Sequence, residues 1–128
     1  MRGLVVDDTL CFGCRACSSA CTPSVIRLRE ADGSRLVWFP GTCQEDCTRC
    51  QEVCPKEAIS FEETDREREG RELRFALRHC DRCGRPFAPE KVLADLAPRV
   101  RQALATEETS WLTLCLSCRR EEAVSGLL

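Results

Sequence analysis

Residues 11–21 read CFGCRACSSAC, and residues 43–54 read CQEDCTRCQEVC. Each stretch places four cysteines within eleven or twelve positions, which is unusual for zinc because two adjacent cysteine pairs do not all reach one ion. A run of closely spaced cysteines instead winds three thiolates around a 4Fe-4S cubane, whose fourth ligand comes from elsewhere in the chain. The two stretches therefore predict two 4Fe-4S clusters. Zinc knuckles, or the loss of one cluster, are the alternatives.

The two stretches belong to an internal repeat with a period of about 33 residues. Each is preceded and followed by a short apolar run with the composition of a β-strand: residues 4–6, 25–28, 36–39 and 58–61. The unit of strand, cysteine stretch and strand thus occurs twice. This pattern predicts an α+β module with pseudo-twofold symmetry, in which the metal centres replace part of the hydrophobic core.

The last four cysteines form two further pairs, Cys80 with Cys83 and Cys115 with Cys118, and together they read C-x2-C-x31-C-x2-C. Two such pairs make a closed tetrahedral site, so zinc is the first choice of metal. A single iron on the same four sulfurs is the second, and a third iron-sulfur cluster or an empty dithiol pair are further alternatives. His79 precedes Cys80 directly, but with four cysteines present we expect it not to be a ligand.

Residues 62–74 are nearly all charged, so we expect them to contribute little to a core. This composition predicts a two-cluster domain over residues 1–64, a charged linker over 65–76 and a four-cysteine, zinc-ribbon-like domain over 77–128. Within the last, a helical pattern is interrupted by Pro98, which predicts a kinked helix or two short ones. Its apolar positions that share one face are Val92, Leu93, Leu96, Val100 and Leu104.

Composition limits the compartment and the class of function. The chain has 12 cysteines among 128 residues, and it begins MRGLVVDD without the apolar run of a secretory signal, so we expect a reducing cytoplasm. No stretch approaches the ~20 apolar residues of a membrane span. Residues 1–66 contain 11 acidic and 8 basic residues before any cluster charge is added, which argues against a nucleic-acid binder. With no nucleophile–base pair or phosphate loop, we expect no active site.

The first eight cysteines resemble those of bacterial two-cluster ferredoxins, in which the fourth cysteine of each run crosses over to the other cluster. The resemblance implies one cluster on Cys11, Cys14, Cys17 and Cys54, and a second on Cys43, Cys47, Cys50 and Cys21. Pro55 follows Cys54 as in that family. The chain departs from the pattern after Cys21, where proline is delayed to Pro23, and between Cys43 and Cys47, where three residues replace the usual two. We expect the extra residue to bulge outward.

The order of all the motifs resembles the small iron-sulfur subunits of formate hydrogenlyase and energy-converting nickel-iron hydrogenase complexes, which are relatives of the two-cluster subunit of respiratory complex I. The ferredoxin signature lies in residues 11–17, CFGCRAC, and 50–59, CQEVCPKEAI. The more specific part is a tail with residues 82–89, RCGRPFAP, and residues 115–119, CLSCR. The resemblance implies the bacterial two-4Fe-4S ferredoxin fold followed by a small helical four-cysteine domain.

The same resemblance implies an electron-relay subunit without catalysis of its own. Its partners would be iron-sulfur and catalytic subunits of hydrogenase or formate dehydrogenase type, and any membrane attachment would come through them. An independent ferredoxin carrier is the first alternative. A zinc-ribbon nucleic-acid binder with structural clusters is an alternative of another class, and salt-sensitive binding to DNA or RNA would distinguish it.

Overall fold

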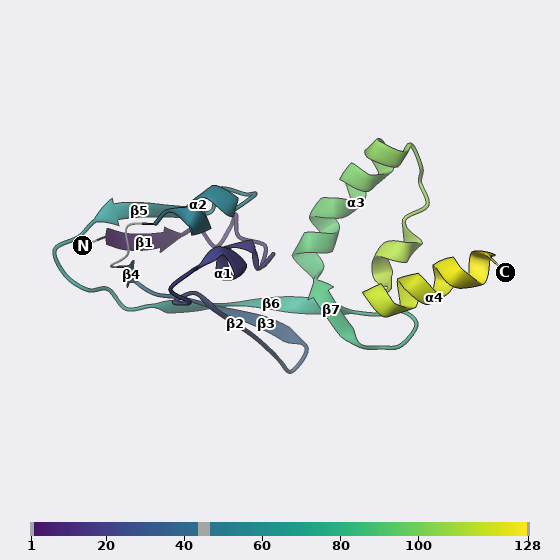
Figure 1. The fold of residues 1–128 in the computed structure, drawn as a ribbon, viewed down its shortest axis with the longest axis horizontal. Helices are drawn as coiled ribbons and strands as arrows, with labels where there is room; N and C mark the ends of the chain where they lie inside the picture. Colours follow the sequence, from purple (N-terminus) through teal and green to yellow (C-terminus); the bar gives the residue numbers. More distant parts are fainter. Residues whose placement is uncertain (1, 44–46, 128) are drawn as a thin grey trace.

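Two antiparallel sheets and a helical tail make up the computed structural model, which describes residues 2–43 and 47–127 (Figure 1). One sheet has the strand order β4-β1-β5, with β1 at Arg2–Val6, β4 at Thr42–Cys43 and β5 at Ile59–Glu63. The other has the order β2-β3-β6-β7, with β2 at Arg27–Ala31, β3 at Ser34–Phe39, β6 at Arg71–His79 and β7 at Pro86–Pro89. The predicted mixture of helices and sheets is confirmed.

The internal repeat of the sequence is visible in the N-terminal part of the fold. Strand β3 follows β1 by one period of the repeat, so that Leu4 and Val6 match Val37 and Phe39, and all four are buried. Each cysteine stretch contains a one-turn helix, α1 at Ala16–Ala20 and α2 at Arg49–Val53, and these two helices pack against each other. The apolar side chains of both halves therefore meet in one core between the sheets.

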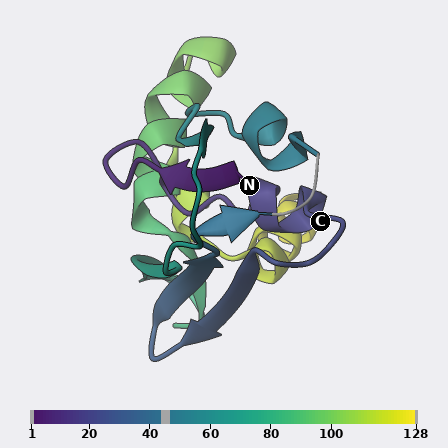
Figure 2. The same cartoon turned by 90° about the vertical axis from the view of Figure 1, so that its left-hand side faces the viewer.

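A tight turn connects β2 to β3 and fixes the register of this hairpin. Asp32 and Gly33 both have positive φ angles, 53° and 73°, as a type I′ turn requires. The pairing runs from Ala31 opposite Ser34 to Arg27 opposite Trp38. Alternate residues therefore face either the core or the opposite surface of the sheet. Figure 2 shows the hairpin with α1 and α2 on one side of it.

The charged segment predicted as a linker contains the beginning of a long strand. Residues 71–76 lie in β6, which pairs with β3 from Phe39 opposite Arg71 to Ser34 opposite Ala76. Leu73 packs against the core, and Phe75 is 4% exposed. Glu72, Arg74 and Arg78 occupy alternate positions on its other face, whereas Arg71 shares the side of Leu73 and Phe75, so the high average charge of the segment hid a period of two. The segment before it also packs closely, because a Cβ on Gly70 would lie 2.2 Å from the Trp38 ring.

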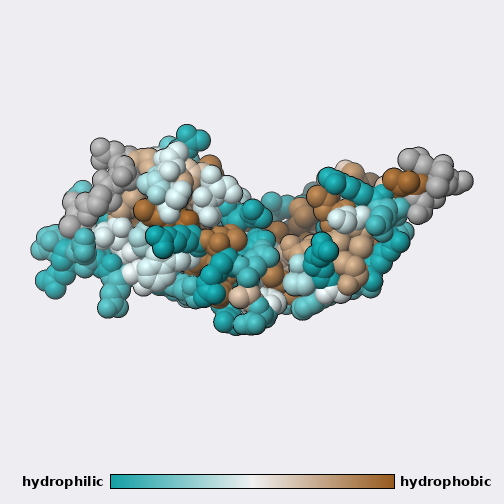
Figure 3. Space-filling view, turned by 60° about the horizontal axis from the view of Figure 1, so that its bottom comes forward, coloured by the Kyte–Doolittle hydropathy of each residue, from teal (hydrophilic) through white to brown (hydrophobic). Residues whose placement is uncertain are grey.

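The tail extends from the end of β6 and forms a second lobe of the molecule (Figures 1 and 3). It comprises β7, helix α3 at Glu90–Leu104, a short 3-10 helix η1 at Ser110–Thr113 and helix α4 at Leu116–Leu127. Helix α3 is not split, since it continues through Pro98 and loses only one backbone hydrogen bond there. On the predicted apolar face, Val92, Leu93 and Val100 are half-buried, whereas Leu96 and Leu104 are exposed.

Candidate metal centres

Four cysteines from both halves of the repeat line one cavity. Cys11, Cys14 and Cys17 come from the first stretch, and Cys54 reaches the same cavity from the end of α2. Apolar residues of β3 and β5, Val37, Phe39 and Ile59, form part of its wall. The structure thus brings together the four cysteines that the resemblance to two-cluster ferredoxins implied for the first cluster.

The loop that carries Cys11 and Cys14 is shaped by local backbone contacts. The backbone N–H of Cys11 donates to the carbonyl of Asp7 at 3.0 Å, which turns the chain back after β1. Gly13 has a φ of +79°, and a Cβ at this position would lie 2.8 Å from the Phe75 ring. Glycine is therefore required at position 13 both for its backbone conformation and for the close approach of β6.

The second group of cysteines also gathers around one place. Burial raises the pKa of the Cys50 thiol, and nearby Cys21, Cys43 and Cys47 raise it further because each can carry negative charge. This set includes Cys43, in spite of the extra residue that follows it. The expected bulge at residues 44–46 lies outside the described residues.

Sequence spacing accounts for the position of Cys43. Cys11 follows the last residue of β1, Val6, by five positions, whereas Cys43 follows the last residue of β3, Phe39, by only four. The additional residue before Cys47 restores the period, so that Cys14 and Cys47 are again equivalent positions of the repeat. The segment before Cys43 is thus one residue shorter than its equivalent in the first half, and the segment after Cys43 is one residue longer.

Three of the eight N-terminal cysteines, Cys17, Cys43 and Cys50, are buried, and the other five are partly buried. Burial raises the pKa of Cys17 to about 12, and the neighbouring Cys11, Cys14 and Cys50 act in the same direction. Burial also raises the pKa of Cys11. Without compensating positive charge these thiols are neutral at pH 7, so iron has to displace their protons. Such thiols fit a metal centre that is bound through thiolates.

The tail cysteines form a tighter group of a different kind. The sulfurs of Cys80, Cys83, Cys115 and Cys118 all lie within 4.8 Å of one another, and the Cys83 and Cys115 sulfurs are 3.7 Å apart. A tetrahedral ion with bonds of about 2.3 Å places its sulfurs about 3.8 Å apart. In the part of the chain that the structure describes, the other eight cysteines form no such compact group. The tail geometry thus fits one ion, and the eight N-terminal cysteines are spread more widely than a single ion requires.

Backbone amides prepare Cys80 to be a thiolate. Its sulfur accepts hydrogen bonds from the N–H groups of Arg82, Cys83 and Cys115 at 3.3–3.5 Å. Burial acts to raise the pKa of Cys80, but the three donors outweigh it and lower the pKa to about 6. Gly84, at a φ of +77°, closes the turn that aims these amides at the sulfur. His79 is exposed and is not part of the compact sulfur group.

Two arginines that the sequence analysis did not single out contact the cysteine loops. The Nη1 of Arg35 donates to the Gly13 carbonyl at 2.8 Å, and the Nη2 of Arg2 donates to the Cys47 carbonyl at 2.9 Å. The two arginines are separated in the sequence by one period of the repeat. That spacing was the signal in the sequence by which they could have been found.

Residues 3–55 match the family model of the 4Fe-4S dicluster domain. A ferredoxin from Pyrobaculum islandicum is 40% identical to this chain over 57 residues, which cover 44% of the chain and 50% of that ferredoxin. The chain thus spans about half the length of this curated relative. Both comparisons support a ferredoxin-like iron-sulfur protein, and the four tail cysteines lie outside the residues that match the family model. None of the helices described in the structure is long and apolar enough to cross a membrane.

Proposed function

We propose that this chain is an electron-relay subunit, without an active site of its own, that carries two 4Fe-4S clusters within a multisubunit redox complex. The observation that carries the proposal is the cavity in which Cys54 joins Cys11, Cys14 and Cys17 across the repeat. A 4Fe-4S cluster bound there takes up and releases one electron at a time. Phe39 and Ile59 of the cavity wall are buried and limit the access of water.

Contact between the two cysteine groups supports transfer from one cluster to the other. Cys50 of the second group lies near enough to Cys17 of the first to raise its pKa. Both residues are buried in the shared core, and they belong to the paired helices α1 and α2. The ligand sets proposed are Cys11, Cys14, Cys17 and Cys54 for cluster 1, and Cys43, Cys47, Cys50 and Cys21 for cluster 2.

In the tail we propose a structural zinc on Cys80, Cys83, Cys115 and Cys118, in a zinc-ribbon-like site. The tetrahedral sulfur spacing and the backbone donors to Cys80 support a closed site. Metal and acid-labile sulfide analysis of anaerobically purified protein tests both parts of the proposal. We expect about eight iron, about eight sulfide and about one zinc per chain. About nine iron without zinc would make the tail a redox site, and fewer than about four iron would rule out the relay.

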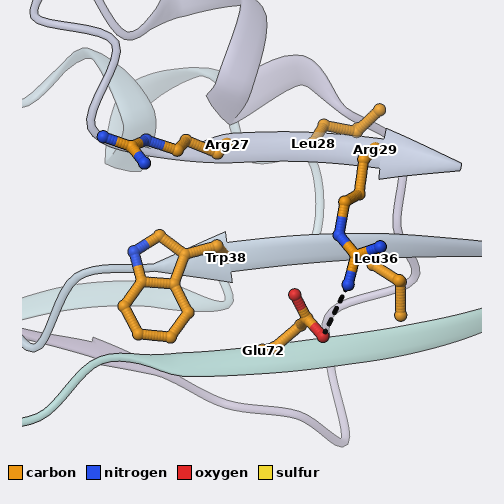
Figure 4. A pocket seen from close by; sticks show the side chains of 6 residues that line it. All are labelled: Arg27, Leu28, Arg29, Leu36, Trp38 and Glu72. Atoms are coloured by element: carbon orange, nitrogen blue, oxygen red, sulfur yellow. Dashed lines mark ion pairs between the residues drawn. The ribbon is translucent and has the colours of Figure 1, made fainter.

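The outer face of the β2–β3 hairpin supports docking to a partner. We define this face by the groove residues Arg27, Arg29, Leu36, Trp38 and Glu72 (Figure 4). Trp38 is 38% exposed there, and its neighbours in the chain, Val37 and Phe39, line the cavity of cluster 1 on the opposite side of the strand. An aromatic contact on this face would thus lie one strand away from a redox centre.

The charge of the outer face indicates what kind of surface it fits. The two positive charges of Arg27 and Arg29 outnumber the single negative charge of Glu72, which pairs with Arg29 at 3.6 Å. The whole chain carries a formal charge of −2, so the face is opposite in sign to the rest of the molecule. We propose an acidic patch on an adjoining iron-sulfur or catalytic subunit as its occupant. The double variant Arg27→Glu/Arg29→Glu should release the chain from its native complex, while Arg66→Glu on an exposed loop should not.

The identity of the complex is proposed from the resemblance of the tail to hydrogenase-associated subunits, and the partners are of hydrogenase or formate dehydrogenase type. The proposed location is the cytoplasm, with any membrane attachment made through those partners. Native purification tests it: the chain should co-migrate with hydrogen- or formate-dependent dye reduction. An independent ferredoxin carrier is the second candidate, because the matched relative is itself a ferredoxin. A monomer on size exclusion of the native material would favour that candidate.

A further inference from the structure

Arg2 and Arg35 brace the two cysteine loops in a crossed arrangement. Arg35 belongs to β3, in the second half of the repeat, and donates to the loop of the first cysteine stretch. Arg2 belongs to β1, in the first half, and donates to the loop of the second stretch. Each loop is therefore held by an arginine of the opposite half, just as the proposed ligand sets take their fourth cysteine from the opposite half.

The surroundings of the two arginines repeat as well. Glu30 lies directly opposite Arg35 in the β2–β3 pairing, and Glu63 lies directly opposite Arg2 in the β1–β5 pairing. These two glutamates are also separated by one period of the repeat. The Nε and Nη2 of Arg35 donate to one oxygen of Glu30 at 3.1 and 2.9 Å. A crossing arginine with a facing glutamate is thus a component of each repeat unit.

The hydrogen bond from Arg35 fixes the orientation of a peptide group in the cluster loop. In a trans peptide the carbonyl and the following N–H point in opposite directions. Because the Gly13 carbonyl points at Arg35, the N–H of Cys14 points away from it. Gly13 and Cys14 both line the cavity of cluster 1. The same reasoning applies to the Cys47 carbonyl, which Arg2 holds, and to the N–H of Thr48.

The positive charge of Arg35 also acts on the first cysteine loop, in addition to the orientation of the peptide group. The Arg35 side chain is only 6% exposed, whereas that of its partner Glu30 is 41% exposed. Water therefore screens the carboxylate more than the guanidinium, and a positive field remains at the loop. Reduction adds negative charge to a cluster, so a buried cation nearby stabilises the reduced state. Arg2 is half-buried and lies 4.2 Å from the centre of the Phe61 ring, so its charge is also partly withdrawn from water.

We propose that Arg35 and Arg2 are positioning residues that raise the reduction potentials of the two clusters separately, Arg35 that of cluster 1 and Arg2 that of cluster 2. The inference rests on the proposed function, since it requires both clusters to be bound. It goes beyond that function because it assigns an independent control to each centre. A relay with two separately adjusted potentials can set the order in which its centres are reduced.

The test is a redox titration of the full-length, cluster-loaded chain, monitored by electron paramagnetic resonance, with iron and sulfide measured on each sample. Arg35→Met should lower the potential of one cluster, and Arg2→Met should lower the potential of the other. Arg66→Met, the same change on an exposed loop with a side chain 85% exposed, serves as the matched control and should shift neither. Arg35→Lys, which keeps the charge, should recover part of the shift.

Glu30→Gln separates an electrostatic role from a structural one. This variant removes the negative charge and leaves the guanidinium in place, so it should raise the potential that Arg35→Met lowers. A merely structural clamp would give a shift of the same sign in both variants, or none, and would overturn the proposal. Equal shifts of both clusters in either arginine variant would also overturn it. Fewer than about eight iron in the unmodified chain would instead count against the proposed function.

Discussion

Lys56 and Asp95 form an ion pair that joins the segment after the second cysteine stretch to helix α3 of the tail. Both side chains are about three-quarters buried, with 26% and 24% of their surfaces exposed. Arg99, one turn further along α3, contacts the other oxygen of Asp95 at 3.1 Å. The contact therefore connects the ferredoxin-like part directly to the four-cysteine tail.

We expect Asp95→Asn to loosen the tail from the N-terminal part without loss of iron. The hydrogen bond from Lys56 lowers the pKa of Asp95 below its ordinary value of 3.8, with a further contribution from the charge of Arg99. A lowered folded-state pKa means that the contact is at full strength above the ordinary pKa of 3.8 and is lost as the pH falls through the lowered pKa. Hydrogen exchange of α3 measures this. At pH 7 we expect the amides of α3 to exchange faster in Asp95→Asn than in the unmodified chain. Equal rates in the two proteins would contradict the prediction.

Gly13 and Phe75 define a second prediction. Gly13→Ala should destabilise the first cysteine loop by at least about 1–2 kcal/mol, the cost of a side chain at positive φ, and the contact with Phe75 adds to it. Phe75→Ala should cost about 3–5 kcal/mol because it opens a cavity in the core. Thermal unfolding and iron retention measure both effects. Gly33→Ala is the control, since Gly33 has a similar positive φ of +73° but a Cβ there would make only ordinary van der Waals contacts. A loss of iron as great as in Gly13→Ala would assign the effect to backbone strain alone.

The repeat and the cysteine groups could be predicted from the sequence because their spacing is local and regular. Strands β1, β3 and β5 include most of the apolar runs around the cysteines, and β2 begins at Arg27, within the run predicted over 25–28. The tail cysteines meet as their two C-x2-C pairs indicated. In each case a short pattern determined the local structure.

Strand β6 and the contacts of the crossed arginines, Arg2 and Arg35, were identified only in the structure. The strand was missed because Arg71, Glu72 and Arg74 dominate the composition, although Leu73, Phe75 and Leu77 alternate with charged or small residues. Its pairing with β3 joins segments far apart in the sequence and has no local signal. The contacts of Arg2 and Arg35 also join residues far apart in the sequence. Only the spacing of the two arginines by one period of the cysteine repeat could have indicated them.

Removal of one tail ligand tests whether the two metal sites are independent. Cys83→Ser should reduce zinc from about one per chain to near zero, while iron stays at about eight. Ser117→Ala, an exposed change in the other cysteine pair, should leave zinc unchanged. In Cys83→Ser, the amides of helix α4 should exchange faster, because Cys118 in its first turn loses the ion that ties it to Cys80, directly after β6. Loss of a redox signal in Cys83→Ser would show that the tail holds redox-active iron.

If the fourth cysteine of each stretch binds the other cluster, double cysteine variants should differ in how much iron they lose. Cys14→Ala and Cys54→Ala should each remove about four of about eight iron, and the double variant should remove the same four, because both thiols line one cavity. Cys14→Ala combined with Cys21→Ala should remove nearly all the iron, since these neighbours in sequence would serve different clusters.

Iron and sulfide analysis with Ser19→Ala as the control distinguishes the two outcomes, because Ser19 is an exposed residue of the same short helix α1. Loss of about eight iron in the Cys14/Cys54 variant and about four in the Cys14/Cys21 variant would mean that each stretch holds its own cluster. Such a result would conflict with the position of Cys54 in the first cavity. It would also separate the ligand pattern from the crossed arginines, which reach the opposite loops whichever cluster each cysteine binds.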